Sequence, residues 1–325
     1  MLVDPNDGCN IVQEYTNLAM RVTNKCAAPT DALACCDPAK ALTRSIAPPD
    51  RTGARFTAPF AADAKDITSW IAGGRYIWHN AKGFDIQTGS DWTKDLDLGA
   101  GNAATAVAAD GGVAIAGFCG NGCNPVGFTR GLAVGKPGDP TSWKRTGDPG
   151  GPTTNVVDGS GAVVRQLPNR YVGAVAVDPT SHALVVAFNG YSRRWVAGPG
   201  ISTNPEAGTG HVFISRDKGV TWTDISANLP DVPLSSVKVL SNGALVAASD
   251  LGVVYTPSAT TGTWYRLGGG LPLTVVTDLE VEPDGDLYAA TYGRGIWKIA
   301  GATVGATPAD GGVVGTVASR ASTTR

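Results

Sequence analysis

The chain has 325 residues and a formal net charge of −2, which is room for one large domain or two ordinary ones. Gly supplies 43 residues and charged side chains only 17%, so helix formers are scarce and turn residues abundant. This composition excludes helical bundles and coiled coils. The sequence has no dense Lys/Arg cluster and no long apolar run, so we expect neither nucleic-acid binding nor a membrane span.

Six copies of one pattern follow each other along the chain. In each copy an apolar run ends in Asp, Pro or Gly turn residues, and a second short apolar run follows. The copies occupy residues 2–15, 58–74, 105–117, 174–187, 237–248 and 279–291. Each copy predicts a β-hairpin whose strands are too apolar to be half exposed, so each sheet should be packed on both faces.

A Trp that follows a short polar or Gly turn closes most of these units. It stands at Trp92, Trp143, Trp222 and Trp264. Four short strands per unit, with an aromatic residue at a fixed place, indicate the blades of a β-propeller. A sandwich of irregular strands is the alternative, but it gives no reason for Trp to return at the start of each fourth strand.

The sequence therefore predicts an all-β fold, a β-propeller of four-stranded antiparallel blades, with six blades visible and six or seven in total. Residues 1–300 form this domain. The blades are expected near residues 1–52, 56–97, 102–147, 170–226, 233–267 and 273–299. The last blade stops after a third strand, so residues 302–318 or a segment upstream of Met1 should complete it. Otherwise residues 301–325, rich in Gly, Ala, Thr and Ser, are a tail.

The cysteines are an even set with poor zinc spacing, which favours disulfides: Cys9, Cys26, Cys35, Cys36, Cys119 and Cys123. Cys119 and Cys123 flank a Gly-rich loop and are expected to pair. Because adjacent cysteines pair only under strain, Cys9 and Cys26 are the expected partners of Cys35 and Cys36, with two connectivities open. Disulfides indicate an oxidising compartment. No signal peptide begins the chain, which looks like a mature or truncated portion of a secreted protein.

The unit from His211 to Trp222 carries the most specific motif, Ser215-x-Asp217-x-Gly219-x-Thr-Trp222. It resembles the Asp-box of the sialidase-like propeller superfamily, which includes sialidases, family 74 xyloglucanases and sortilin-type receptors. In that box the residues are structural: Asp accepts backbone N–H bonds, Gly supplies a positive φ, and Trp packs between sheets.

Other strings extend the resemblance to secreted bacterial proteins described as sialidase-like or glycosyl hydrolases. They are residues 167–171, 190–195, 228–230 and 289–297. The resemblance implies that ligands bind on the face formed by blade-joining loops and by loops between second and third strands, here called the ligand face. The Asp-box hairpins lie on the opposite face.

Arginine and aromatic residues on the ligand face are the expected ligand-binding residues: Arg75, Arg170, Tyr191, Arg193, Arg194, Trp195, Tyr292 and Arg294. Guanidinium groups bind carboxylates or sulfates, and aromatic rings stack on sugars, so an oligo- or polysaccharide is the expected partner, and an acidic sugar would fit. The alternative is that the arginines cap carbonyls between blades or pair with a blade carboxylate, namely Asp50, Asp97, Asp158 or Asp250. The aromatic rings would then pack on their own loops.

Glycoside hydrolysis needs two carboxyl groups roughly 5 to 10 Å apart. Asp250 is the best single candidate because it follows an apolar strand before a tight turn on the ligand face, although it could also simply cap that turn. No second acid stands out, and Arg75-Tyr-Ile-Trp78 does not match the sialidase arginine motif. The isolated His79, His182 and His211 form no metal motif, so no metal or cofactor is expected.

Three functions remain open on this evidence. The first is an extracellular protein that interacts with glycans through its ligand face. The second is an active glycoside hydrolase that uses a pair of carboxylates. The third is a structural propeller that binds another protein in an extracellular assembly.

Overall fold

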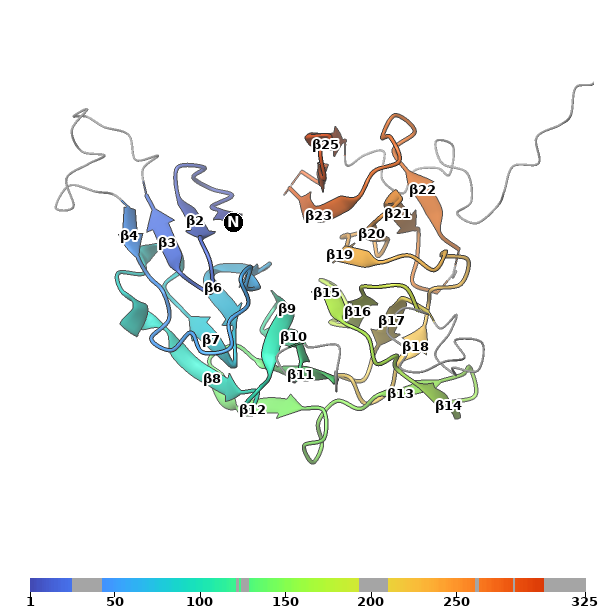
Figure 1. Cartoon of the computed structure of the whole chain (residues 1–325), viewed down its shortest axis with the longest axis horizontal. Coiled ribbons are helices and arrows are strands. Elements are labelled where there is room, and N and C mark those ends of the chain that lie inside the picture. The colour runs from blue at the N-terminus through green and yellow to red at the C-terminus, as the bar shows by residue number, and fades with distance from the viewer. Residues whose placement is uncertain are drawn as a thin grey trace, which may run out of the picture.

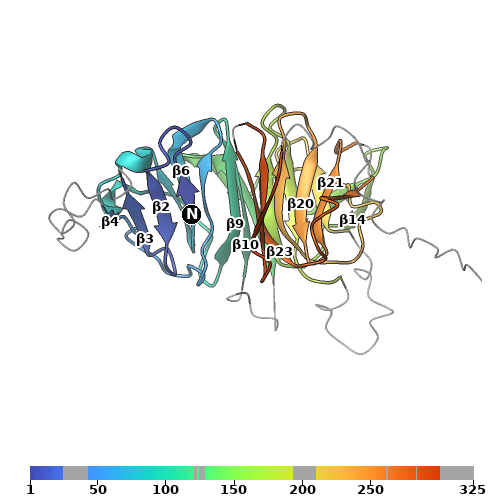
Figure 2. The ribbon, with the colours of Figure 1, turned by 90° about the horizontal axis from the view of Figure 1, so that it is seen from above.

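The computed structural model describes residues 1–24, 43–120, 123, 129–192, 210–260, 263–282 and 284–300. Within them nearly all regular structure is β, and Figure 1 shows the strands as blades that fan around a common axis from the first blade to the last. Figure 2, turned by 90°, shows that the strands run roughly along this axis. The expected all-β propeller of four-stranded antiparallel blades is confirmed.

Five of the blades have four described strands each, with consecutive strands antiparallel. The first three blades consist of β1 (Leu2–Val3), β2 (Ile11–Glu14), β3 (Met20–Thr23) and β4 (Thr43–Ser45); β5 (Phe60–Asp63), β6 (Asp66–Gly73), β7 (Tyr76–Asn80) and β8 (Thr93–Asp97); and β9 (Ala103–Asp110), β10 (Val113–Cys119), β11 (Arg130–Lys136) and β12 (Asp139–Arg145). A single parallel bridge, Asp63 to Ala109, links β5 of the second blade to β9 of the third.

The second half of the chain builds three more blades. They consist of β15 (Val172–Val177), β16 (Leu184–Phe188), β17 (Val212–Ser215) and β18 (Thr223–Asp224); β19 (Leu234–Val239), β20 (Leu245–Ser249), β21 (Gly252–Thr256) and β22 (Tyr265–Leu267); and β23 (Val276–Val281), β24 (Leu287–Thr291) and β25 (Ile296–Ile299). Between the third and fourth blades stands a short hairpin, β13 (Asn155–Val157) with β14 (Val163–Gln166). Two short 3₁₀ turns, η2 (Gly83–Asp85) and η3 (Gly89–Asp91), connect β7 to β8.

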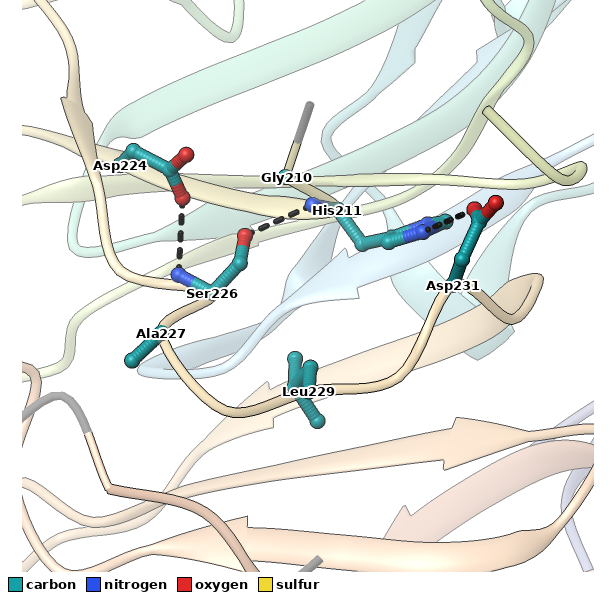
Figure 3. Close-up of a pocket in the computed structure, with 7 residues that line it drawn as sticks. All are labelled: Gly210, His211, Asp224, Ser226, Ala227, Leu229 and Asp231. Atoms are coloured by element: carbon teal, nitrogen blue, oxygen red, sulfur yellow. Dashed lines mark hydrogen bonds and ion pairs between the residues drawn. The ribbon is translucent and has the colours of Figure 1, made fainter. Parts of the chain in front are cut away.

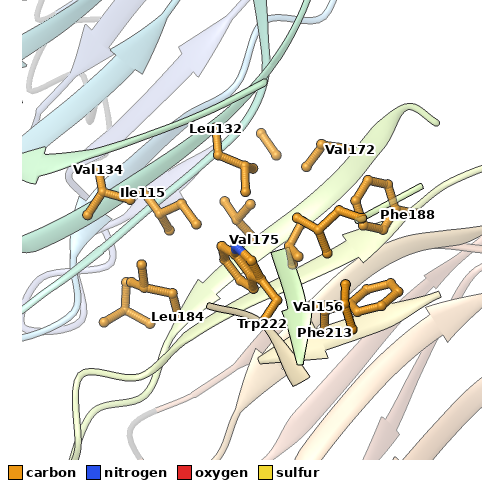
Figure 4. Packing of buried hydrophobic residues seen from close by; sticks show 14 residues of the cluster. Ile115, Leu132, Val134, Val156, Val172, Val175, Leu184, Phe188, Phe213 and Trp222 are labelled. Carbon is orange, nitrogen blue, oxygen red and sulfur yellow. The ribbon is translucent and has the colours of Figure 1, made fainter. Parts of the chain in front are cut away.

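The core lies between the blades rather than inside any one of them. In Figure 4, Ile115 and Leu132 of the third blade pack against Val172, Val175 and Trp222 of the fourth. The other four clusters likewise join consecutive blades. The apolar patterning of the strands is explained by this arrangement, because each inner sheet contacts a neighbour on both faces.

The four repeated Trp residues are buried at or just before a fourth strand. Their indole N–H groups donate back along the chain: Trp92 to the carbonyl of Ile46 at 2.6 Å, Trp222 to that of Thr153 at 3.0 Å, Trp264 to that of Ile225 at 2.7 Å, and Trp143 to the carboxylate of Asp95 at 3.2 Å. Each Trp therefore fixes its own blade to the segment or blade before it, because a buried indole N–H needs a partner.

Candidate functional site

Antiparallel strands send successive connections to opposite ends of each blade, so the propeller has two distinct faces. One face carries the turns between first and second strands and between third and fourth strands; we call it the hairpin face. The other carries the turns between second and third strands and the blade-joining segments, which is the ligand face defined above.

The motif hairpin between β17 and β18 lies on the hairpin face. The Ser215 hydroxyl donates to Asp217 at 2.7 Å and accepts from the backbone N–H of Gly219 at 2.7 Å. Asp217 also accepts from the backbone N–H of Thr221 at 2.8 Å and from its hydroxyl at 2.6 Å. Gly219 has φ +89°, a conformation in which a side chain would be strained. These bonds shape the turn that buries Trp222.

Hydrogen bonding also decides the protonation state of Asp217. Burial raises the pKa of this carboxyl, but the bonds from Thr221 and Ser215 together outweigh burial and hold the pKa below its usual value. Asp217 is therefore ionised throughout the neutral range, as an acceptor of these bonds must be.

A second hairpin, between β11 and β12, is also held by carboxylates, but one of them comes from another blade. Its own Asp139 bonds to Thr141, at 3.1 Å to the N–H and 2.6 Å to the hydroxyl. The acid that fixes its Gly138 and Trp143 is Asp95, from β8 of the preceding blade, at 2.9 and 3.2 Å. Burial raises the pKa of Asp95, and its Oδ1 atom has no hydrogen-bond partner.

Arg170, a residue predicted to bind ligand, is buried to 1% exposure. Its guanidinium donates to the carbonyl oxygens of Gly190, at 3.2 Å, and Gly210, and to Nδ1 of His211 at 3.2 Å. These bonds tie the segment before β15 to both ends of the β16–β17 connection. Through these hydrogen bonds the buried Arg170 holds loops of the ligand face in place.

His211 continues the same network toward the surface. Because a guanidinium can only donate, Nδ1 of His211 accepts from Arg170, and Nε2 carries the hydrogen that is donated to Asp231 at 3.0 Å. Burial, followed by the charge of Arg170, lowers the pKa of His211, so the ring is neutral. Figure 3 shows His211 and Asp231 at a pocket of about 330 Å³, which Asp224, Ser226 and Leu229 also line.

Asp231 is an acid that sequence reasoning missed. The backbone N–H and hydroxyl of Ser192 donate to it at 2.7 and 2.8 Å. The neighbouring Tyr191 donates its hydroxyl to Asp250 at 3.3 Å. Consecutive residues of one loop therefore hold two carboxylates on the ligand face. Although burial raises the pKa of Asp231, the bonds from Ser192 and His211 keep it below its usual value.

The other predicted residues are spread around the ligand face. Arg75 forms two bonds to Asp97, at 2.9 and 2.8 Å, and this pairing raises the pKa of Arg75 and lowers that of Asp97. Tyr292 and Arg294 lie in the exposed turn between β24 and β25. Arg193, Arg194 and Trp195 lie outside the described residues. The structure thus brings Tyr191 and Asp250 together and places Arg170 near them, but it separates them from Arg75.

A larger pocket, of about 620 Å³, opens on the ligand face where the first three blades meet. It is lined by two chain segments and one arginine, namely residues 52–56, Arg75 and residues 100–103. Gly53 has φ +70°, and a side chain there would press on the Asn102 carbonyl at 3.1 Å. The volume falls within the range of about 300–1,000 Å³ that small-molecule sites occupy.

The side chains at this pocket combine an open aromatic ring with an arginine. Phe56 is 74% exposed and Tyr15, in the adjacent β2–β3 turn, 85%. The Arg55 guanidinium lies 5.2 Å from the ring centroid of Tyr171, which precedes the fourth blade. Among the described residues no carboxylate forms an ion pair with Arg55. Of the residues that line this pocket, only Arg75 was predicted from the sequence. The adjacent Arg55 and Phe56 in a blade-joining loop could have indicated a binding site.

The structure also bears on the cysteines and on membranes. Cys119 and Cys123 are joined by a disulfide. Cys9 is disulfide-bonded as well. Its expected partners, Cys35 and Cys36, lie outside the described residues, as does Cys26. A search of the described part of the chain found no helix with the length and apolar character needed to cross a bilayer.

Comparison with known proteins places the fold. No protein-family description matches the chain, and no curated protein does. Among solved structures, a luciferin-regenerating enzyme matches with a TM-score of 0.51 at 10% identity over 97% of this chain and 91% of that one. The extracellular domain of BT4673 from B. thetaiotaomicron matches with a TM-score of 0.50 at 14% identity over 90% of this chain and 32% of that one.

A family 74 xyloglucanase from Xanthomonas campestris matches with a TM-score of 0.49 at 14% identity, over 80% of this chain and 38% of the xyloglucanase. The chain thus spans about a third of the length of BT4673 and of the xyloglucanase. At these identities the likenesses to the luciferin-regenerating enzyme and to BT4673 show the propeller fold alone.

Proposed function

We propose that the protein is a secreted, Asp-box propeller of the sialidase-like type that binds glycans on its ligand face. The 620 Å³ pocket at the junction of the first three blades supports this most directly. It is lined by Phe56, whose ring is in solvent, and by Arg55, which has no carboxylate partner among the described residues. The exposed Tyr15 lies in the adjacent β2–β3 turn. A sugar ring stacks on an aromatic face while its hydroxyl or carboxylate oxygens accept from arginine.

The Asp-box assignment is supported by the bonding of Ser215, Asp217 and Gly219, in which every motif residue takes part in the turn. Secretion is supported by the disulfide between Cys119 and Cys123, because disulfides persist in oxidising compartments.

The test is a binding screen of the full chain against plant, microbial and sialylated glycans. Glycan binding that falls at least about tenfold in Phe56→Ala and in Arg55→Ala, with unchanged unfolding, is the expected result. The control is Val220→Ala, an apolar residue on the hairpin face that is 48% exposed, against 74% for Phe56. Binding to none of the glycans, or equal binding by Phe56→Ala and Val220→Ala, would overturn the proposal.

A glycoside hydrolase is the second candidate, and the arrangement of Asp231 and Asp250 favours it. Tyr191 and Ser192 hold these two carboxylates from consecutive positions of one loop. The measurement is release of reducing ends from the same glycans, with Asp250→Asn and Asp231→Asn as variants. Release abolished by either substitution would establish hydrolysis, whereas binding without release would leave the first function.

A further inference from the structure

The third strand of the sixth blade differs from its counterparts in the other blades. In the fourth and fifth blades the third strands, β17 and β21, are buried at every residue, and each has a fourth strand paired along its outer edge. β25 pairs with β24 on one side, and in the part of the chain that the structure describes no strand pairs with its other side. Three of its four residues are exposed.

The exposed side chains of β25 are large and apolar. Ile296 is 75% exposed and Trp297 38%. Nearby Leu273, Val275 and Tyr292 are exposed too, and the N–H of Tyr292 donates to the carbonyl of Val275 at 2.8 Å. An apolar strand with an unpaired edge is a template for another strand, and folded proteins cover or block such edges.

We propose that the chain's own C-terminal segment, residues 301–325, pairs with β25 as the fourth strand of the sixth blade. In each of the other five blades the fourth strand follows the third directly in sequence. The connections are residues 24–42, 81–92, 137–138, 216–222 and 257–264, so they span from 2 to 19 residues. The segment after β25 is long enough for a connection of this size and a strand.

The sequence of the segment places that strand at Val313–Val317. Residues 309–313 repeat the sequence Ala-Asp-Gly-Gly-Val of residues 109–113. In the third blade this sequence forms the β9–β10 turn, with positive φ at both glycines, and its Val begins β10. The residues from Val313 on are rich in β-branched side chains, which favour strands. A strand beginning at Val313 leaves residues 300–312 as the connection, which is within the observed range.

Hydrogen exchange of the backbone amides of Ile296–Ile299 tests the proposal. We compare the full chain with Val314→Pro, which cannot pair within a strand, with the matched Val314→Thr, which can, and with a chain that ends at Ala300. The expected result is exchange at least about tenfold faster in Val314→Pro and in the truncated chain than in the parent and Val314→Thr.

Two outcomes would overturn the proposal. Equal exchange in the parent and Val314→Pro would show that the segment does not cover β25. Protection that rises with protein concentration would show that a second copy covers it. Because Val314→Pro lies outside the described blades, it gives this answer even if the truncated chain fails to fold.

Discussion

The two faces of the propeller are made by the same strands but use their polar side chains differently. On the hairpin face, Ser215 and Asp217 satisfy each other and the turn they belong to. On the ligand face, polar groups bond across loops, as Tyr191 does to Asp250, and rings such as that of Phe56 stand in solvent. The difference is that the polar groups of the hairpin face stabilise their own turns, whereas the ligand face leaves aromatic rings exposed, where we propose that a partner binds.

Trp222→Ala gives the largest expected effect and tests the hairpin face as scaffold. The side chain is fully buried in the cluster between the third and fourth blades, so its loss should cost about 3–5 kcal/mol of unfolding free energy. Denaturant unfolding measures this cost, with the exposed Val220→Ala of the same hairpin as control. A cost below about 1 kcal/mol in Trp222→Ala would contradict the assignment.

Phe56→Ala tests the ligand face in the opposite sense. The ring is exposed, so its loss should leave the unfolding free energy unchanged to within about 0.5 kcal/mol while glycan affinity falls at least about tenfold. Calorimetric titration and denaturant unfolding of the same preparation separate the two effects. Loss of stability together with affinity would mean that Phe56 belongs to the scaffold.

Asp217→Ala should have a smaller effect than Trp222→Ala, about 1 kcal/mol, because the carboxylate is exposed and water replaces part of its bonding. The effect should depend on pH. Since the folded state lowers the pKa of Asp217, its stabilisation is present above the ordinary carboxyl pKa and is lost as pH falls through the folded value. The unfolding free energies of parent and variant, measured from pH 7 to pH 2.5, should therefore converge at the acid end. A difference between them that stays constant with pH would contradict this.

Asp95→Asn should change the unfolding free energy least, and its dependence on pH should be opposite to that of Asp217→Ala. Burial raises the pKa of Asp95 in the folded state, so the parent loses stability as pH rises from the ordinary carboxyl pKa through the folded value. The amide oxygen can still accept from Gly138 and Trp143. Asp95→Asn should therefore be as stable as the parent at pH 7 or slightly more stable. Denaturant unfolding of both proteins at pH 4 and at pH 7 measures this difference. Strong destabilisation at pH 7 would show that the charge is required.

The fold was readable from the sequence because its signals are local. Alternating apolar runs and turn residues predict each hairpin, and a repeated Trp marks most of the blades. The strands form at the positions that these patterns predict. Trp143 shows the limit of such reading: its carboxylate partner is Asp95, 48 residues earlier in another blade. No spacing within one hairpin reveals a partner supplied by the neighbouring blade.

The ligand face was harder to predict because its residues meet only in the folded ring. Arg170 was predicted to bind ligand, with capping of carbonyls between blades as the alternative, and the structure buries it against His211 and backbone carbonyls. Arg55 and Tyr171 are brought together by the stacking of blades, although 115 residues separate them. Whether an arginine meets a carboxylate, an aromatic ring or a backbone carbonyl depends on such long-range contacts, and composition and spacing do not report them.

The most direct test of the difference between the faces is one titration series. Parent, Phe56→Ala and Val220→Ala are titrated with the glycan that binds best in the screen. The expected result is equal affinity for the parent and Val220→Ala, and at least about tenfold weaker binding for Phe56→Ala. Equal affinity in all three proteins, or a greater loss of affinity in Val220→Ala, would contradict glycan binding at the pocket that Phe56 lines.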